Sequence, residues 1–573
     1  MIALEQDLSE LVTQGLKAAV KFSFDSDAWN QILRSGSPHT WYATGRDEIG
    51  NLLYNEMNMG SNTLGYTSYA NGTRALYIEG QVNYNRTFGN HNLNGLLLYN
   101  QREYQEAVGS SIGALPYRSQ GLAARVAYSY NDRYFIEGNF GYNGSENFAP
   151  GKRFGFFPSV ALGWMVSNEP FFLNNVSPSI MDSFKLKVSL GQSGNDQIGG
   201  GRRFVYLPTI VGSQGANWGK SNTWTDGVAV GEVANDEVSW ETSTKLNVGM
   251  ETRIFDALRL QVDWFYEKRK GIFVQRKSVP DYAGVSTMPW SNVGEMSNKG
   301  IDLTLEYDKT FHNGFFLSLR GTFTYARNKQ INDDQPDYID TYRNRNGQKY
   351  NQQYGLVALG LFQSQEEIDN SPSQFGVDYL RPGDIKYKDI NGDGVIDTSD
   401  EVPIGYSDVP EIVYGAGISM SWKGFDFSLF FQGIGRTTFF LGGSYFPFNY
   451  PNSGRTAFLA DQADKYFDSD KQNFDAELPL LYAEGWHGSN YVASTWWQRS
   501  GAYVRLKNAE LGYTLPKNFT RKMLVKSVRF FLAGTNLLTF APDVKLWDPE
   551  IGSTDGRGYP LMKTVNLGLN INF

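Results

Sequence analysis

The chain contains no cysteine among its 573 residues. This absence excludes disulfide bonds, thiolate metal sites and cysteine nucleophiles. The chain also lacks an excess of positive charge, because its formal net charge is −8 at pH 7. Binding to nucleic-acid phosphates needs a basic surface, so we expect no nucleic-acid partner.

Long apolar runs are absent as well. Hydrophobic residues make up 41% of the chain, its mean hydropathy is −0.41, and no run approaches the roughly 20 apolar residues of a membrane helix. Such a chain can span a bilayer only as a barrel of strands, because lipid offers the backbone no hydrogen bonds. Residues 1–8 also lack the features of a secretory signal. Since the strand pattern and the aromatic content described next indicate export, we expect the chain to be the C-terminal portion of a longer protein.

Alternation with a period of two is the main positive signal. From Val565 to Phe573 every odd position is apolar, and the positions between are asparagine or glycine. One face of such a strand is apolar and the other is polar. Aromatic residues make up 15% of the chain, and tyrosine and tryptophan favour the two rims of a membrane barrel. The same alternation recurs near 76–83, 184–190, 245–251, 258–267 and 315–324.

These patterns predict about 16 strands, which fall near 12–25, 73–88, 91–104, 119–130, 133–143, 155–169, 182–193, 238–254, 258–270, 296–308, 314–328, 412–422, 425–438, 499–515, 525–540 and 559–573. Short connections alternate with long ones near 26–72, 194–237, 329–411 and 439–498. Short turns at one end and long loops at the other are typical of an outer-membrane barrel. We therefore predict an all-β, antiparallel transmembrane β-barrel, with 1–573 as one domain and its long loops extracellular.

Three runs of residues resemble those of a known family. They are Trp240–Gly249 (WETSTKLNVG), Gly383–Gly394 (GDIKYKDINGDG), and Tyr503–Tyr513 (YVRLKNAELGY) followed by Ala533–Leu538 (AGTNLL). In combination they resemble the C-terminal barrel of SusC/RagA-type TonB-dependent transporters of the Bacteroidota. The resemblance covers essentially the whole chain.

The resemblance implies a barrel of about 22 strands with a plugged lumen in the cell outer membrane, in contact with its lipid. It implies active, TonB-dependent import of oligosaccharides (glycans) with a SusD-like surface lipoprotein; peptide import by the same mechanism is the alternative. The family's plug and early strands have no counterpart here. The chain would then supply about 16 of about 22 strands, would meet the TonB complex only through the missing N-terminal region, and would leave the strand near 12–25 with an unpaired edge.

The segment from Asp389 to Asp400 (DINGDGVIDTSD) fits a calcium-binding loop. Gly394 falls at the sixth position, where such a loop turns sharply. The Asp at the last position is shorter than the usual Glu, so magnesium is an alternative ion, and a turn without any ion is the other interpretation. The predicted ligands are Asp389, Asn391, Asp393, the carbonyl of Val395, Asp397 and Asp400.

Six tryptophans in or beside long connections are candidate cargo-binding residues, because sugar rings and peptide side chains both stack on indoles. They are Trp218, Trp224, Trp290, Trp486, Trp496 and Trp497. No enzyme is predicted, since the four histidines (His39, His91, His312 and His487) show no zinc-pair spacing. A passive porin-like barrel and a soluble all-β glycan-binding or glycan-cleaving protein stay open as alternatives.

Overall fold

The protein is described from a computed structural model. It covers residues 1–61, 63–107, 111–199, 202–280, 282, 287–377, 379–442, 445–446, 459–482, 488–523, 525–551 and 556–573.

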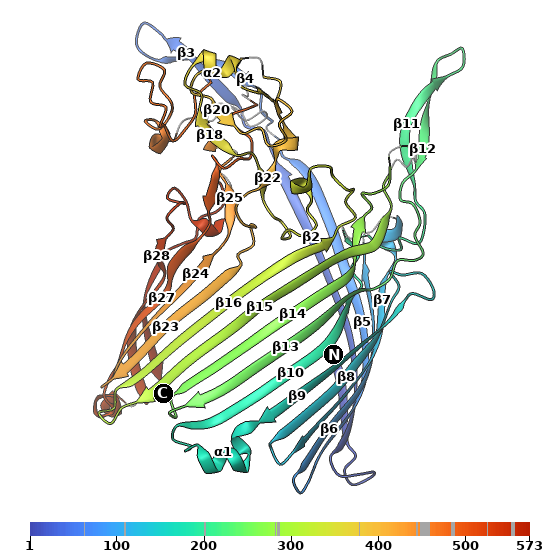
Figure 1. Cartoon of the computed structure of the whole chain (residues 1–573), viewed down its shortest axis with the longest axis vertical. Coiled ribbons are helices and arrows are strands. Elements are labelled where there is room, and N and C mark those ends of the chain that lie inside the picture. Colours follow the sequence, from blue (N-terminus) through green and yellow to red (C-terminus); the bar gives the residue numbers. More distant parts are fainter. Residues whose placement is uncertain are drawn as a thin grey trace.

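One antiparallel sheet of 17 strands dominates the molecule (Figure 1). Apart from the two edge strands, each strand pairs with the main-sheet strand before it and the one after it in the chain, so the prediction of an all-β antiparallel architecture is confirmed. The strands are β1 (Ile2–Asp7), β2 (Leu16–Ser35), β5 (Gly65–Phe88), β6 (His91–Glu106), β7 (Tyr117–Tyr130), β8 (Tyr134–Ser145), β9 (Phe154–Met165), β10 (Met181–Asn195), β13 (Glu241–Ile254), β14 (Leu258–Gln275), β15 (Trp290–Thr310), β16 (Phe316–Asn332), β23 (Ile412–Trp422), β24 (Phe425–Gly435), β27 (Tyr503–Thr514), β28 (Ser527–Phe540) and β29 (Thr564–Asn572).

The first strand corrects the sequence prediction. β1 pairs with β2 from Ile2 opposite Phe22 to Asp7 opposite Lys17, so the strand near 12–25 does not have the unpaired edge that we expected. Within the described residues the two edges of the sheet are β1 and the closing strand β29. β1 lacks the alternation by which the other strands were predicted, because apolar residues fill its first half and polar residues its second.

The connections differ strongly between the two ends of the sheet. At one end lie tight turns such as 89–90 and 423–424, together with the short helix α1 (Pro170–Asn175). At the other end lie the long connections, several of which project far beyond the sheet (Figure 1). The helices α1, α2 (Gln365–Asp369) and α3 (Lys517–Thr520) are short, and no helix of the described chain has the length and apolar character needed to cross a bilayer.

The long connections contain strands of their own. β2 and β5 stay paired up to Ser35 and Gly65, so much of the 26–72 segment continues this hairpin. A separate hairpin follows, β3 (Thr40–Arg46) with β4 (Leu52–Asn58), and another, β11 (Ile210–Trp218) with β12 (Thr223–Val230), extends from the 194–237 segment. Shorter pieces are β17 (Tyr354–Gly355), β18 (Ala358–Leu361), β19 (Ser373–Gln374), β20 (Ile385–Tyr387), β21 (Val395–Ile396), β22 (Val402–Pro403), β25 (Thr438–Phe440) and β26 (Gln498–Ser500).

Alternation sorts side chains onto two faces of the main sheet. One row crosses six strands from β10 to β23 as Val188, Val248, Trp264, Ile301, Tyr325 and Ile412. The adjacent row holds Lys187, Gly249, Asp263, Asp302 and Thr324. We call the apolar face the outer face and the polar face the inner face. The outer side chains are well exposed, with Val248 at 46% and Trp264 at 43%, as a lipid-contacting surface requires.

A charge on the outer face tests this assignment. We expect Leu303→Arg on β15 to destabilise the barrel by roughly 2–4 kcal/mol in a bilayer, because lipid solvates an arginine poorly at mid-depth. The matched control is Thr304→Arg, one residue along the same strand and on the inner face, where we expect little change. Denaturant titration of the protein folded into lipid vesicles measures both. Equal losses would contradict the assignment of faces.

Candidate functional site

The inner face carries ion pairs that run from strand to strand. The ammonium nitrogen of Lys187 on β10 lies 2.8 Å from Glu251 on β13 and 3.0 Å from Asp263 on β14. Gly249 separates Lys187 from Asp263 in the sheet, and a Cβ there would meet Asp263 at 2.2 Å and Lys187 at 2.3 Å. Gly249 therefore leaves the space in which the two charges meet. The inner face is a fixed polar wall with charges of both signs.

Two long connections fold together into one unit at the end opposite the tight turns. We call this unit the cap, and it comprises the described residues of 333–411 and 438–500. Its core draws on both segments, which no single stretch of sequence reveals. The buried members are Leu356, Leu361, Ile385, Tyr387, Ile396, Leu441, Tyr445, Phe446, Phe467, Leu478, Tyr491 and Trp497.

Buried hydrogen bonds also join the two halves of the cap. Asp384 is fully buried, and its carboxylate accepts from the Asn490 amide at 2.7 Å and the Tyr482 hydroxyl at 2.7 Å. Gln374 donates to the Ser489 hydroxyl at 2.7 Å and accepts from the Tyr387 backbone N–H at 2.9 Å. Burial, followed by the neighbouring Asp384 carboxylate, raises the pKa of Tyr482. A network whose members are paired in this way favours one arrangement of the cap.

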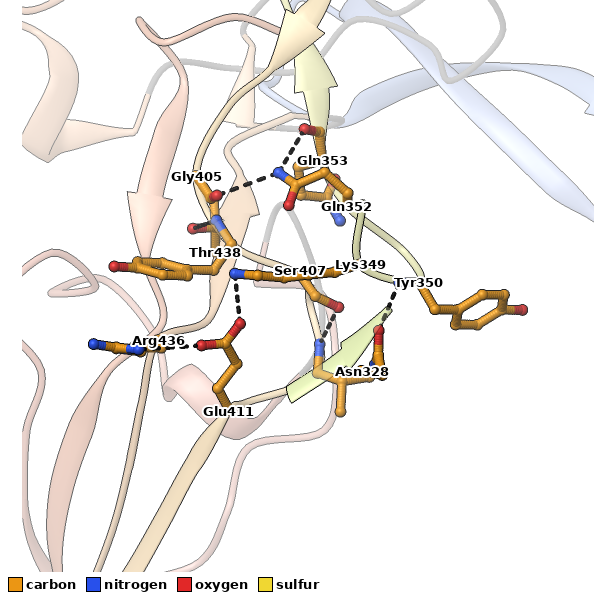
Figure 2. Close-up of polar contacts among 12 residues, drawn as sticks. Asn328, Lys349, Tyr350, Gln352, Gln353, Gly405, Ser407, Glu411, Arg436 and Thr438 are labelled. Atoms are coloured by element: carbon orange, nitrogen blue, oxygen red, sulfur yellow. Dashed lines mark hydrogen bonds and ion pairs between the residues drawn. The ribbon is translucent and has the colours of Figure 1, made fainter. Parts of the chain in front are cut away.

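An ion cluster joins the cap to the rim of the sheet, and Figure 2 shows Glu411 between Lys349 and Arg436. Glu411 is the last residue of the first cap segment and immediately precedes β23, Arg436 immediately follows β24, and Lys349 lies within the first cap segment. The Glu411 carboxylate lies 2.5 Å from the Lys349 ammonium and 3.5 Å from the Arg436 guanidinium. Glu411 is 6% exposed, so its charge depends on these partners. We call these three residues the junction.

Backbone hydrogen bonds support the junction. The Tyr350 N–H donates to the side-chain oxygen of Asn328 on β16 at 2.7 Å (Figure 2). The Tyr406 N–H donates to the Thr438 hydroxyl at 2.9 Å. The Gln352 amide donates to the Gly405 carbonyl at 3.2 Å. Hydrogen bonds thus hold both the beginning and the end of the 333–411 segment close to the rim of the sheet.

The predicted calcium loop lies on the cap and folds around its own carboxylates. Asp400 is fully buried and accepts from the backbone N–H groups of Ile390 at 2.7 Å and Asp397 at 3.0 Å. Asp389 accepts from those of Gly392 at 2.7 Å and Gly394 at 3.0 Å. These hydrogen bonds hold the first part of the loop in a closed turn. Within the loop, Val395 and the next residue form β21, which pairs with β19.

Not all of the predicted ligands converge in this arrangement. Asn391, Asp393 and Val395 are exposed, and the Asn391 amide donates to Asp393 at 2.9 Å. Across the described residues, no three His, Cys, Asp or Glu side chains gather closely enough to hold a metal ion. The donor set of carboxylate, amide and carbonyl oxygens does fit the ligand preference of calcium. Calcium or magnesium binding at Asp389–Asp400 stays a prediction.

The candidate tryptophans occupy different settings. Trp218 and Trp224 are exposed on the β11–β12 hairpin. Trp290 stacks on Phe273 at 5.2 Å between ring centroids, and Trp496 packs against the cap core. Trp497 is 2% exposed and its indole N–H donates to the Asn490 carbonyl, so it is a core residue. Trp486 lies outside the described residues.

The sequence analysis missed the groups that join segments distant in the chain. Asp384 stood within a motif used only for the family resemblance, and nothing marked Asn490 as its partner. Glu411 could have been noticed as an acid at the start of a strand, but its two cations lie 62 residues before it and 25 after it in the sequence.

Comparison with known proteins shows the family. The profile of the family described as "TonB dependent receptor-like, beta-barrel" matches residues 3–537. The chain belongs to this family, and the predicted kinship with SusC/RagA-type TonB-dependent transporters is confirmed at that level. It is an outer-membrane β-barrel protein. Members of the family are receptors and transporters.

Individual relatives agree with this assignment. TonB-dependent receptor P3 of Formosa agariphila is 28% identical over 563 residues, which cover 88% of this chain and 53% of the relative. TonB-dependent receptor SusC of Bacteroides thetaiotaomicron is 24% identical over 461 residues, covering 78% of this chain and 43% of the relative. The chain spans about half the length of the curated relatives it matches.

A solved structure shares the fold. The structure titled "Structure of the RagAB peptide transporter" superimposes with a TM-score of 0.74 at 19% identity, covering 98% of this chain and 60% of that one. At this identity the likeness concerns the fold alone.

Calcium should protect the loop from proteolysis. We expect cleavage within residues 383–402 to slow when calcium is added and to recover with a chelator, because a bound cation would offset the repulsion between carboxylates. In Asp393→Asn the calcium response should be lost, while cleavage without metal stays as in the wild type. Cleavage that is indifferent to calcium in the wild type would contradict the site. Mass spectrometry of the fragments provides the measurement.

Removing the junction acid should loosen the cap. We expect Glu411→Gln to destabilise this region by about 3 kcal/mol, because it leaves the Lys349 ammonium, whose side chain is only 12% exposed, without its counter-charge. Hydrogen exchange at residues 402–411 should then accelerate. The matched control is Glu367→Gln, which removes the more exposed pair with Lys386 and should cost below about 1 kcal/mol. Unchanged exchange in Glu411→Gln would show that the cap does not depend on the junction.

Proposed function

We propose that the chain forms the membrane wall and surface cap of an active importer of oligosaccharides (glycans). The observation that carries the proposal is the sorting of side chains in a single-layer sheet, with apolar rows on one face and ion-paired rows on the other. That arrangement suits a wall between lipid and a wet lumen. The cap, with its own core, suits cargo capture, and the end that carries it would face outside the cell.

Two partners are part of this proposal. We infer that a SusD-like lipoprotein docks over the cap end and that a TonB complex drives transport through a region beyond this chain. The relative named SusC and the similarity to a RagAB structure support this inference. The wall and cap act by binding and guiding cargo, with no catalytic step.

Peptides are the second candidate cargo. The structural neighbour's title names a peptide transporter, and both amide groups and aromatic rings bind peptides as readily as sugars. A passive porin-like barrel differs from both, because it needs no energy source.

Uptake by whole cells separates these functions. We expect cells with the protein to accumulate labelled neutral oligosaccharides and to lose that uptake, down to the level of a deletion strain, when TonB is removed. A labelled peptide mixture of similar mass serves as the comparison cargo. Peptide uptake alone would favour the second candidate. Uptake that persists without TonB would indicate a passive barrel and contradict active import.

A further inference from the structure

The inner face of β6, β7 and β8 is hollowed near the cap end of the sheet. The hollow has a volume of about 730 Å³ and also touches the start of the 194–237 connection and Trp240. We call it the inner-wall niche. Its lining combines amide, hydroxyl and aromatic side chains, among them Asn143, Ser119 and Tyr117. A niche of this size is large enough for a small ligand or for one part of a larger one.

A row of three residues forms the floor of the niche. Asn100 on β6 lies opposite Gly121 on β7, and Gly121 lies opposite Asn143 on β8. A Cβ on Gly121 would meet the side-chain oxygen of Asn143 at 2.6 Å and that of Asn100 at 2.9 Å. The two amides therefore converge over a strand that has no side chain at this point. Gly121 makes that convergence sterically feasible.

Polar groups in the niche are left for a ligand. Among the described residues, the Asn143 amide and the Arg102 guanidinium have no hydrogen-bond or ion-pair partner, although Arg102 lies 5.8 Å from the Tyr104 ring centroid. Asn143 is half-buried, so water reaches it less freely than an exposed amide. A half-buried amide without a protein partner is a ready donor and acceptor for bound cargo.

Aromatic rings beside these groups are held in place. The rings of Tyr104 and Tyr117 lie 5.9 Å apart between centroids. The guanidinium of Arg203 lies 3.6 Å from the Tyr117 ring centroid and donates to the carbonyls of Leu115 at 2.7 Å and Pro116 at 2.8 Å. These contacts fix the position of the Tyr117 ring. Fixed aromatic surface lowers the entropy lost when a ring-shaped ligand binds.

We propose that the inner-wall niche is a cargo subsite for a neutral sugar ring. An amide pair presents donors and acceptors to hydroxyl groups, while adjacent aromatic rings pack against the apolar face of a pyranose. The lining of the niche has three cations and three anions, namely Arg102, Arg118, Arg203, Glu106, Glu146 and Asp196, so it does not select for one net charge. The proposal rests on glycan import as the proposed function.

Two substitutions test the subsite against a matched control. Gly121→Ala forces the two amides apart, and Asn143→Ala removes one of them without adding bulk. Gly138→Ala is the control, because it lies on the outer face of β8 and its new Cβ would meet nothing within 4 Å. Heat-dependent migration on gels confirms that each variant is folded. The protein extracted from outer membranes is applied to an array of neutral hexose, pentose and N-acetylhexosamine oligosaccharides, and separately to a labelled peptide mixture.

We expect the wild type and Gly138→Ala to bind the same oligosaccharide, and Gly121→Ala and Asn143→Ala to bind it about tenfold more weakly, as the loss of a buried hydrogen bond predicts. Equal binding by all four proteins would overturn the subsite while leaving glycan import intact. A wild type that binds none of the oligosaccharides overturns the sugar assignment, and absent uptake in cells then shows that the proposed function has failed too. Peptide binding that is lost in Asn143→Ala would replace the sugar with a peptide as the ligand.

Discussion

Backbone pairing between neighbours is the constraint on which the rest of the structure depends. A sheet one layer thick has no core behind it, so each main-sheet strand is held mainly by hydrogen bonds to the strands beside it. The period of two then sends alternate side chains to lipid and to the lumen. Rows such as Val248–Trp264 and Gly249–Asp263 follow from that pairing. Both the apolar outer face and the polar inner face are thus consequences of one register.

Two glycines leave space on the inner face for the side chains of adjacent strands. At Gly249 the missing side chain lets Lys187 reach Asp263, and at Gly121 it lets two amides converge. In neither case does the backbone need an unusual conformation, since both positions lie within regular strands. The residue type matters there through the space it leaves for its neighbours in adjacent strands, which sequence spacing alone does not show.

Much of the sheet could be predicted from sequence, because alternation is a local property. The strands around Leu258–Gln275 and Phe316–Asn332 lie where their patterns indicated. β1 was missed because its apolar residues are consecutive. The part of β2 beyond Phe24 was missed because the alternation stops there: three polar residues follow, and the later apolar residues fall on both faces of the strand. The packing of the cap could not be predicted for a different reason. Asp384 and Asn490 are 106 residues apart and pair only after folding. Trp497 stood out as a sequence feature, but its ring lies inside that core.

The shared core of the cap also constrains how this surface can be exchanged or redesigned. The segments 333–411 and 438–500 both contribute to the same packed interior, and Ile385 and Trp497 belong to one buried cluster. Grafting one segment alone from a relative would pair a foreign half-core with a native one and would leave Asp384 without its amide donor. The two segments therefore form one packing unit, and a redesign of the cap must alter both together.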